Sequence, residues 1–90
     1  MDDLTGFQRD LLYVIAGADQ PSGQDVKEEV EKYYSSEINH GRLYPNLDTL
    51  VNKALVEKGQ LDRRTNYYAI SDRGLEQIEA RRKWEEQYLD

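Results

Sequence analysis

The sequence predicts an α+β fold that is mostly helical, with three helices, then a two-stranded antiparallel hairpin, then a final helix. Two observations predict it. Apolar residues recur at helical spacing in residues 5–18, 22–34 and 39–54, and again after residue 71. Between these stretches the period changes to two short runs rich in β-branched and aromatic residues, separated by a polar stretch. The 90 residues show no repeat or linker, so we expect a single domain over residues 1–90. A domain this small gains stability by oligomerising.

The first helix is predicted to begin at Thr5, because Thr5 and Gln8 have the spacing of a capping box. Its apolar face is unusually broad: Phe7, Leu11, Leu12, Tyr13, Val14, Ile15 and Ala18. A face of this width belongs either to the centre of the core or to a subunit interface. The break at residues 21–23 then separates a second helix, which Ser22 or Asp25 can cap and which buries Val26, Val30 and one of Tyr33 and Tyr34.

A third helix is predicted from the cap residue Asn39 to about Ala54, with a buried stripe of Leu43, Leu47, Leu50, Val51 and Ala54. Pro45 lacks an N–H group, so it predicts a late or irregular start to this helix. The polar residues Arg42, Asn46, Thr49 and Lys53 recur at helical spacing and are expected on the face opposite the stripe. We call these four residues the predicted reading face.

The two β-type runs, residues 55–58 and 65–70, predict a hairpin in which Tyr68 and Ile70 face inward. Ser71 can cap a last helix that runs to about Leu89, with Leu75 and Ile78 continuing the core. Near its end Trp84 and Tyr88 stand four residues apart. They either close the core of their own chain or meet a partner subunit, and the scarcity of other apolar residues there favours the partner.

Charge is distributed unevenly along the chain. The net charge is −6, yet residues 38–70 carry five basic against three acidic side chains. An acidic protein with one positive segment is expected to meet an anionic partner there. The chain has no cysteine and one histidine, so we expect no metal, disulfide or catalytic Cys/His set. Paired carboxylates lie adjacent on helices and diverge, and no glycine-rich phosphate loop appears; an enzyme is therefore not expected.

The sequence shows neither a membrane span nor a signal peptide. No apolar run is long enough to cross a membrane, and acids occupy the positions where a signal peptide needs bases. We therefore expect a cytoplasmic protein with no cofactor.

Three helices followed by a hairpin form the order of a winged helix-turn-helix, in which the third helix enters the major groove and the hairpin, or wing, contacts the adjacent backbone. The stretch Leu43–Leu50, followed by Ala54-Leu55-Val56, resembles the recognition-helix signature of PadR-like transcriptional regulators. Residues 62–74, DRRTNYYAISDRG, are similar to their wing and to the start of their last helix. Ala54 stands where the family usually has glycine.

The resemblance implies a homodimer that binds palindromic promoter sites and represses or activates transcription, often with a small-molecule effector. The acidic composition is similar to that of short haloarchaeal members, some of which act in the oxidative-stress response. No counterpart of the family's longer C-terminal coiled coil is seen, which leaves an effector open. The alternative function is a winged-helix module that binds protein and no DNA.

The expected DNA contacts come from the third helix and the wing: His40, Arg42, Tyr44, Asn46, Thr49, Lys53, Arg63, Arg64 and Asn66. The reading face could instead be merely solvated, Tyr44 could be a core aromatic, and His40 could be a plain surface residue. Phe7, Leu11, Trp84 and Tyr88 are expected at the dimer interface, with residues 72–90 as the dimerisation helix. Because the chain is acidic, we also expect salt cations at the DNA interface, near acids such as Glu28, Glu29 and Glu37.

Overall fold

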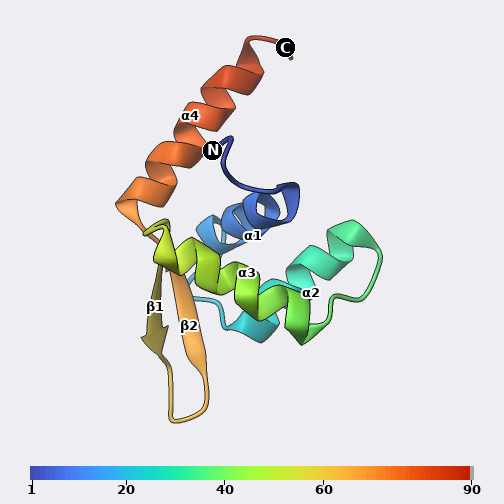
Figure 1. Ribbon diagram of the computed structural model, residues 1–90, viewed down its shortest axis with the longest axis vertical. Coiled ribbons are helices and arrows are strands. Elements are labelled where there is room, and N and C mark those ends of the chain that lie inside the picture. Colours follow the sequence, from blue (N-terminus) through green and yellow to red (C-terminus); the bar gives the residue numbers. More distant parts are fainter. Residues whose placement is uncertain (90) are drawn as a thin grey trace.

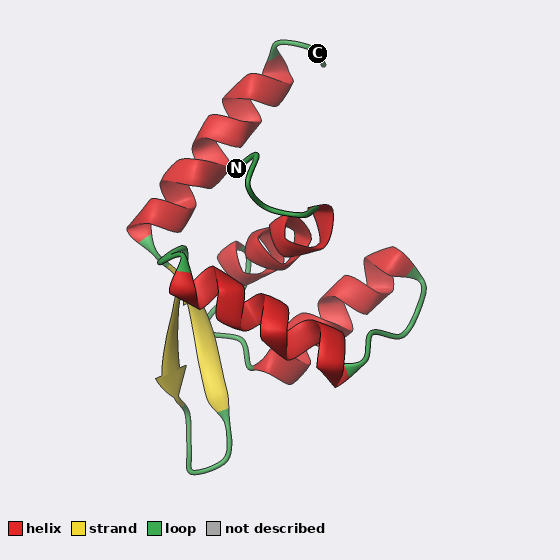
Figure 2. Cartoon of the chain, in the orientation of Figure 1, coloured by secondary structure: helices red, strands yellow, loops and turns green. Residues whose placement is uncertain are grey.

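The computed structural model describes residues 1–89; Asp90, the last residue of the expected dimerisation helix, lies outside that range. Its elements are α1 (Gly6–Ala16), α2 (Gly23–Tyr34), α3 (His40–Asn52), β1 (Val56–Gln60), β2 (Asn66–Ile70) and α4 (Asp72–Glu86). The first three helices form the body of the molecule (Figure 1). The hairpin tip and the far end of α4 project in opposite directions along the longest axis, as the cartoon in Figure 2 also shows. The predicted α+β winged-helix order is confirmed.

The helix starts follow the predicted caps. Thr5 with Gln8, and Ser22 with Asp25, each form a reciprocal capping box. The side chains of Asn39 and Ser71 accept hydrogen bonds from the third backbone N–H of α3 and α4. Capping oxygens satisfy N–H groups that have no partner within the helix, so the sequence marks these boundaries locally.

The core lies between α1, α2, α3 and the base of the hairpin, and is lined by Leu4, Phe7, Leu11, Leu12, Ile15, Val26, Val30, Ile38, Leu43, Leu47, Leu50, Leu55, Val56, Tyr68 and Ile78. Phe7 is 7% exposed and Leu11 is fully buried. Their own chain therefore already covers both side chains, and their place at a dimer interface stays a prediction.

Helix α3 is regular from His40 onward, which corrects the predicted late start. Pro45 lies inside the helix, at its sixth residue. The missing Pro45 N–H costs one intrahelical bond, to the carbonyl of Gly41. The buried leucines at 43, 47 and 50 anchor the helix to the core, and such packing contributes most of a protein helix's stability.

Three predicted apolar positions at helix ends also differ. Leu75 is 43% exposed, and Gly74 occupies the packed position instead. A Cβ atom at Gly74 would collide with the Leu55 carbonyl oxygen, so α4 leaves the hairpin at a contact that only glycine allows. Ala54 is exposed, with φ of 61°, in the turn that follows α3. Ala18 lies past the end of α1 and is exposed, and α4 ends at Glu86 rather than near Leu89.

The hairpin pairs in antiparallel register, with Val56 opposite Ile70 and Lys58 opposite Tyr68. Tyr68 is buried, as predicted, and its backbone N–H donates to the Pro21 carbonyl at 2.9 Å. This bond ties the base of the wing to the turn before α2.

A second link joins α1 to the end of α2. The hydroxyl of Tyr34 donates to Asp10 Oδ2 at 2.6 Å. Burial, and then this hydrogen bond to a carboxylate, raises the pKa of Tyr34 to about 12.

Candidate nucleic-acid interface

The exposed surface of α3 is displaced by one residue from the predicted reading face. Gly41, Pro45, Asp48 and Asn52 are all exposed and form one stripe along α3; we call them the outer ridge. Within the reading face Arg42 is exposed, whereas Asn46, Thr49 and Lys53 are half-buried on one flank. On a helical wheel the outer ridge lies opposite the buried residues Leu43, Leu47 and Leu50. The position of Asp48 and Asn52 on the wheel therefore indicates their exposure, whereas their chemistry alone does not.

Residues 3–8 hold three members of the reading face. Asp3 pairs with Lys53 at 2.8 Å, and the hydrogen bond from Lys53 keeps the pKa of the Asp3 carboxyl below its usual value. The Arg42 guanidinium carbon lies 3.9 Å from the centroid of the Phe7 ring, a cation–π contact. Gln8 Nε2 donates to Asn46 Oδ1 at 3.0 Å. The start of α1 therefore contributes to how α3 presents its side chains.

The remaining member, Thr49, bonds within its own helix. Its hydroxyl donates to the Pro45 carbonyl at 3.0 Å. A threonine hydroxyl can turn from such a bond to another acceptor with little rearrangement, because its hydrogen rotates freely.

The tip of the wing is an ordered loop that presents two arginines. Asp62 Oδ1 accepts hydrogen bonds from the backbone N–H groups of Arg64 and Thr65, at 2.9 and 3.0 Å. These bonds, that of Arg64 foremost, hold the pKa of the Asp62 carboxyl below its usual value. The side chains of Arg63 and Arg64 are exposed, as is Asn66 at the start of β2. Two guanidinium groups on a fixed turn suit phosphate contacts.

A groove of about 310 Å³ lies between the wing, the start of α2 and α3. It is lined by Ser22, Gly23, Gln24, Tyr44, Arg64, Thr65, Asn66 and Tyr68, and we call it the wing groove. Tyr44 is 38% exposed, and His40 packs edge-on against it with ring centroids 5.6 Å apart. A Cβ atom at Gly23 would lie 2.7 Å from the Tyr44 hydroxyl, so glycine makes room for that ring. Tyr44 thus lines a surface groove and is not a core aromatic.

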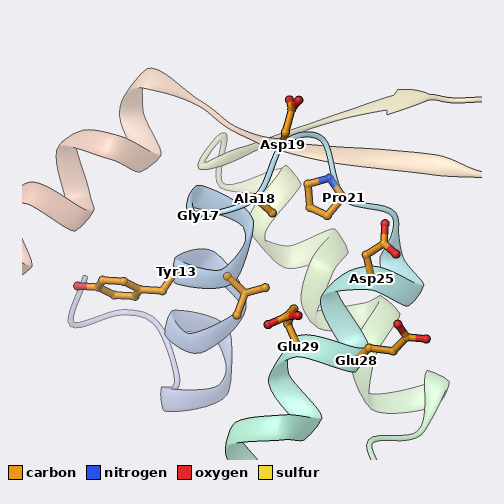
Figure 3. A pocket seen from close by; sticks show the side chains of 9 residues that line it. Tyr13, Gly17, Ala18, Asp19, Pro21, Asp25, Glu28 and Glu29 are labelled. Atoms are coloured by element: carbon orange, nitrogen blue, oxygen red, sulfur yellow. The ribbon is translucent and has the colours of Figure 1, made fainter.

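A separate depression of about 620 Å³ lies between α1 and α2 and shares no lining residue with the wing groove. Figure 3 shows carboxylates at its rim: Asp19 from the turn, and Asp25, Glu28 and Glu29 from α2. Glu28 and Glu29, two of the acids expected near the DNA, line this depression. Glu37 lines another hollow with Lys27, Glu31 and Ser36. The Tyr13 ring points away from the carboxylates.

Within residues 1–89, no group of three or more histidine, aspartate or glutamate side chains is arranged to hold a metal ion. No helix in the same range has the length and apolarity needed to cross a membrane.

Residues 11–80 match the family model for PadR-like transcriptional regulators. The chain belongs to this family. It is therefore a DNA-binding transcriptional regulator with a winged-helix fold, and not an enzyme; the expected family resemblance is confirmed. The alternative of a module that binds protein and no DNA is set aside. No curated protein matches the chain.

Solved structures of RosR from Halobacterium salinarum, a haloarchaeal regulator, are similar to this PadR-like chain. RosR grown from NaBr is 48% identical, with 98% of this chain and 81% of that chain covered and a TM-score of 0.89. The complex structure RosR-SG is 47% identical, with coverages of 99% and 79% and a TM-score of 0.93. The complex structure RosR-S1 is 51% identical, with coverages of 92% and 73% and a TM-score of 0.88.

Proposed function

We propose that this regulator binds duplex DNA as a homodimer, with α3 in the major groove and the wing on the adjacent backbone. The wing groove is the observation that carries the proposal. It is lined by Tyr44 of α3 and by Arg64 and Asn66 of the wing, whose side chains carry a hydroxyl, a guanidinium and an amide. These groups can donate hydrogen bonds to phosphate oxygens. A protein that contacts the DNA backbone there has α3 positioned to reach base edges.

The proposed roles follow from the chemistry of the side chains. Arg42 is the exposed member of the reading face and suits the O6 and N7 acceptors of guanine. Asn46 suits adenine, and Thr49 suits several bases. Lys53 would exchange its bond with Asp3 for a phosphate, and His40 lies close enough to Tyr44 to contact the same backbone. Arg63, Arg64 and Asn66 position the wing and carry little sequence information.

Selection of bound duplexes from a random pool, followed by affinity measurements on the selected site and on random DNA, tests these roles. We expect Arg42→Ala or Asn46→Ala to cost about 1–3 kcal/mol on the selected site and much less on random DNA. Arg63→Ala or Arg64→Ala should weaken binding to both duplexes alike. Arg73→Ala, an exposed arginine on α4, is the matched control and should change neither. Equal losses on both duplexes for Arg42→Ala would refute base reading by that residue.

The homodimer rests on the end of α4. Trp84 is 49% exposed and Tyr88 is 68% exposed, and their rings pack against each other with centroids 5.2 Å apart. An aromatic pair on a helix that projects from the body is an apolar surface suited to a partner subunit. Two symmetric recognition helices would then bind half-sites about one helical turn apart in a palindromic site.

Salt ions at the DNA interface are a further part of the proposal. The outer ridge carries Asp48, whose Oδ1 lies 3.8 Å from Lys58 Nζ. A carboxylate that approaches phosphate needs a compensating cation, either Lys58 or one taken up from solution. Cation uptake opposes the counterion release that makes ordinary DNA binding sensitive to salt.

A further inference from the structure

A chain of hydrogen bonds runs from the first turn of α1 to the recognition helix. The backbone N–H of Thr5 donates to Gln8 Oε1 at 3.1 Å. Gln8 Nε2 donates to Asn46 Oδ1 at 3.0 Å, and Asn46 Nδ2 donates to the Arg42 carbonyl at 2.7 Å. The chain begins at a backbone donor and ends at a backbone acceptor, and neither group can reverse its polarity. Both side-chain amides are therefore held in one orientation.

This orientation decides which hydrogen bonds Asn46 can still make. A flipped Asn46 amide would face Gln8 Nε2 with its own NH₂ group and the Arg42 carbonyl with its own oxygen, losing both bonds. In the observed orientation one N–H and one lone pair of the amide are already used, which leaves one donor and one acceptor. One donor and one acceptor form the pair that an asparagine uses to bind N7 and N6 of adenine. Gln8 and Asn46 are both half-buried, which strengthens the bonds between them relative to bonds in water.

We propose that Gln8, which lies outside the helix-turn-helix, is a positioning residue that sets the base preference of Asn46. The inference rests on the proposed function of Asn46 as a base reader. Gln8 touches no DNA in this account; it acts by fixing the amide of Asn46. A capping residue alone would affect only the stability of α1, so the two roles can be separated.

Gln8→Glu separates them, because glutamate serves as well as glutamine at this position of a capping box. Both oxygens of the substituted carboxylate accept hydrogen bonds, so Asn46 can bond to that carboxylate only by presenting Nδ2, which is the reverse of its present orientation. We expect Gln8→Glu to keep the helix and to weaken the discrimination that Asn46 provides. The added negative charge lowers the affinity for every duplex alike, so the ratio between duplexes isolates the effect on discrimination.

The experiment selects duplexes from a random pool with the wild-type protein, Asn46→Ala, Gln8→Glu and Gln8→Ala, while thermal unfolding monitors the fold. The position at which Asn46→Ala loses its preference is the one that Asn46 reads. At that position we expect both Gln8 variants to lower the discrimination between adenine and the other bases by about threefold to tenfold. Base preferences at the other positions of the site should be unchanged. In the Asn46→Ala background, Gln8→Glu should cause no further loss of base discrimination at the position that Asn46 reads. Gln8→Ala keeps the test decisive if Gln8→Glu fails to fold.

Two results overturn the inference, and they differ. If Asn46→Ala changes no position, Asn46 does not read bases, and its role in the proposed function falls together with that of Gln8. If Asn46→Ala changes a position that both Gln8 variants leave intact, the base reading stands and Gln8 is only a capping residue.

Discussion

Replacing Ala54 by glycine is expected to stabilise the protein. Ala54 lies in the turn between α3 and β1 with φ of 61°, in the left-handed region that favours glycine. PadR-like regulators usually have glycine at this position. The Ala54 side chain is exposed, so little packing is lost with its Cβ atom. The hydrogen bonds of this residue, from its N–H to Val51 and from Ser71 Oγ to its carbonyl, involve only its backbone and persist in the variant.

The magnitude follows from two opposing terms. A left-handed backbone costs an L-residue about 1–2 kcal/mol, which glycine avoids. Glycine also gives the unfolded chain more conformational entropy, which lowers the free energy of unfolding by about 0.4–1 kcal/mol. The difference between the midpoints of these two ranges is an increase of about 0.8 kcal/mol in the free energy of unfolding. For a domain of this size that corresponds to a rise in Tm of roughly 3–6 °C.

Thermal and urea unfolding of the wild-type protein and Ala54→Gly, at one protein concentration, measure the change. Ala54→Val is the matched control at the same site. A β-branched residue is strongly disfavoured at positive φ, so this variant should lose at least about 1 kcal/mol. An Ala54→Gly protein less stable than wild type would refute the reasoning.

Three other predictions concern pH, assembly and salt. The raised pKa of Tyr34 favours its neutral form in the folded state, so its contribution to stability is complete below pH 10 and is lost as the pH rises through about 12. Tyr34→Phe should reduce that alkaline loss of stability, measured by urea unfolding. Removing residues 82–90 should convert the proposed dimer into a monomer or an unstable chain; a folded, dimeric truncation in sedimentation analysis would exclude α4 as the interface. On one duplex, affinity should vary little or even rise from 0.2 to 2 M KCl, and a steep, monotonic loss would show that no cation is taken up.

Local signals predicted the fold well, because capping and periodicity act over a few residues. Thr5, Ser22, Asn39 and Ser71 begin the helices where short-range hydrogen bonding requires it. The start of α3 was predicted incorrectly because Pro45 is unfavourable locally, while the packing that compensates for it comes from distant elements.

The spacing of residues along the sequence does not predict contacts between residues that are far apart in the chain. A broad apolar face such as that of Phe7 and Leu11 does not tell whether its own chain or a second subunit covers it. The pairing of Asp3 with Lys53 joins residues 50 positions apart, and no spacing rule indicates it. The chemistry of the third helix was visible in the sequence, but the partners that restrain its side chains were not.

The contacts from residues 3–8 to α3 affect how DNA targets are inferred from protein sequences. If Gln8 sets the orientation of Asn46, two regulators with identical recognition helices can prefer different promoters when they differ at position 8. A code that translates the recognition helix alone into bases would assign both the same target. Such a code has to take the residues in the first turn of α1 into account. Promoter specificity can then diverge through substitutions at positions that do not contact DNA.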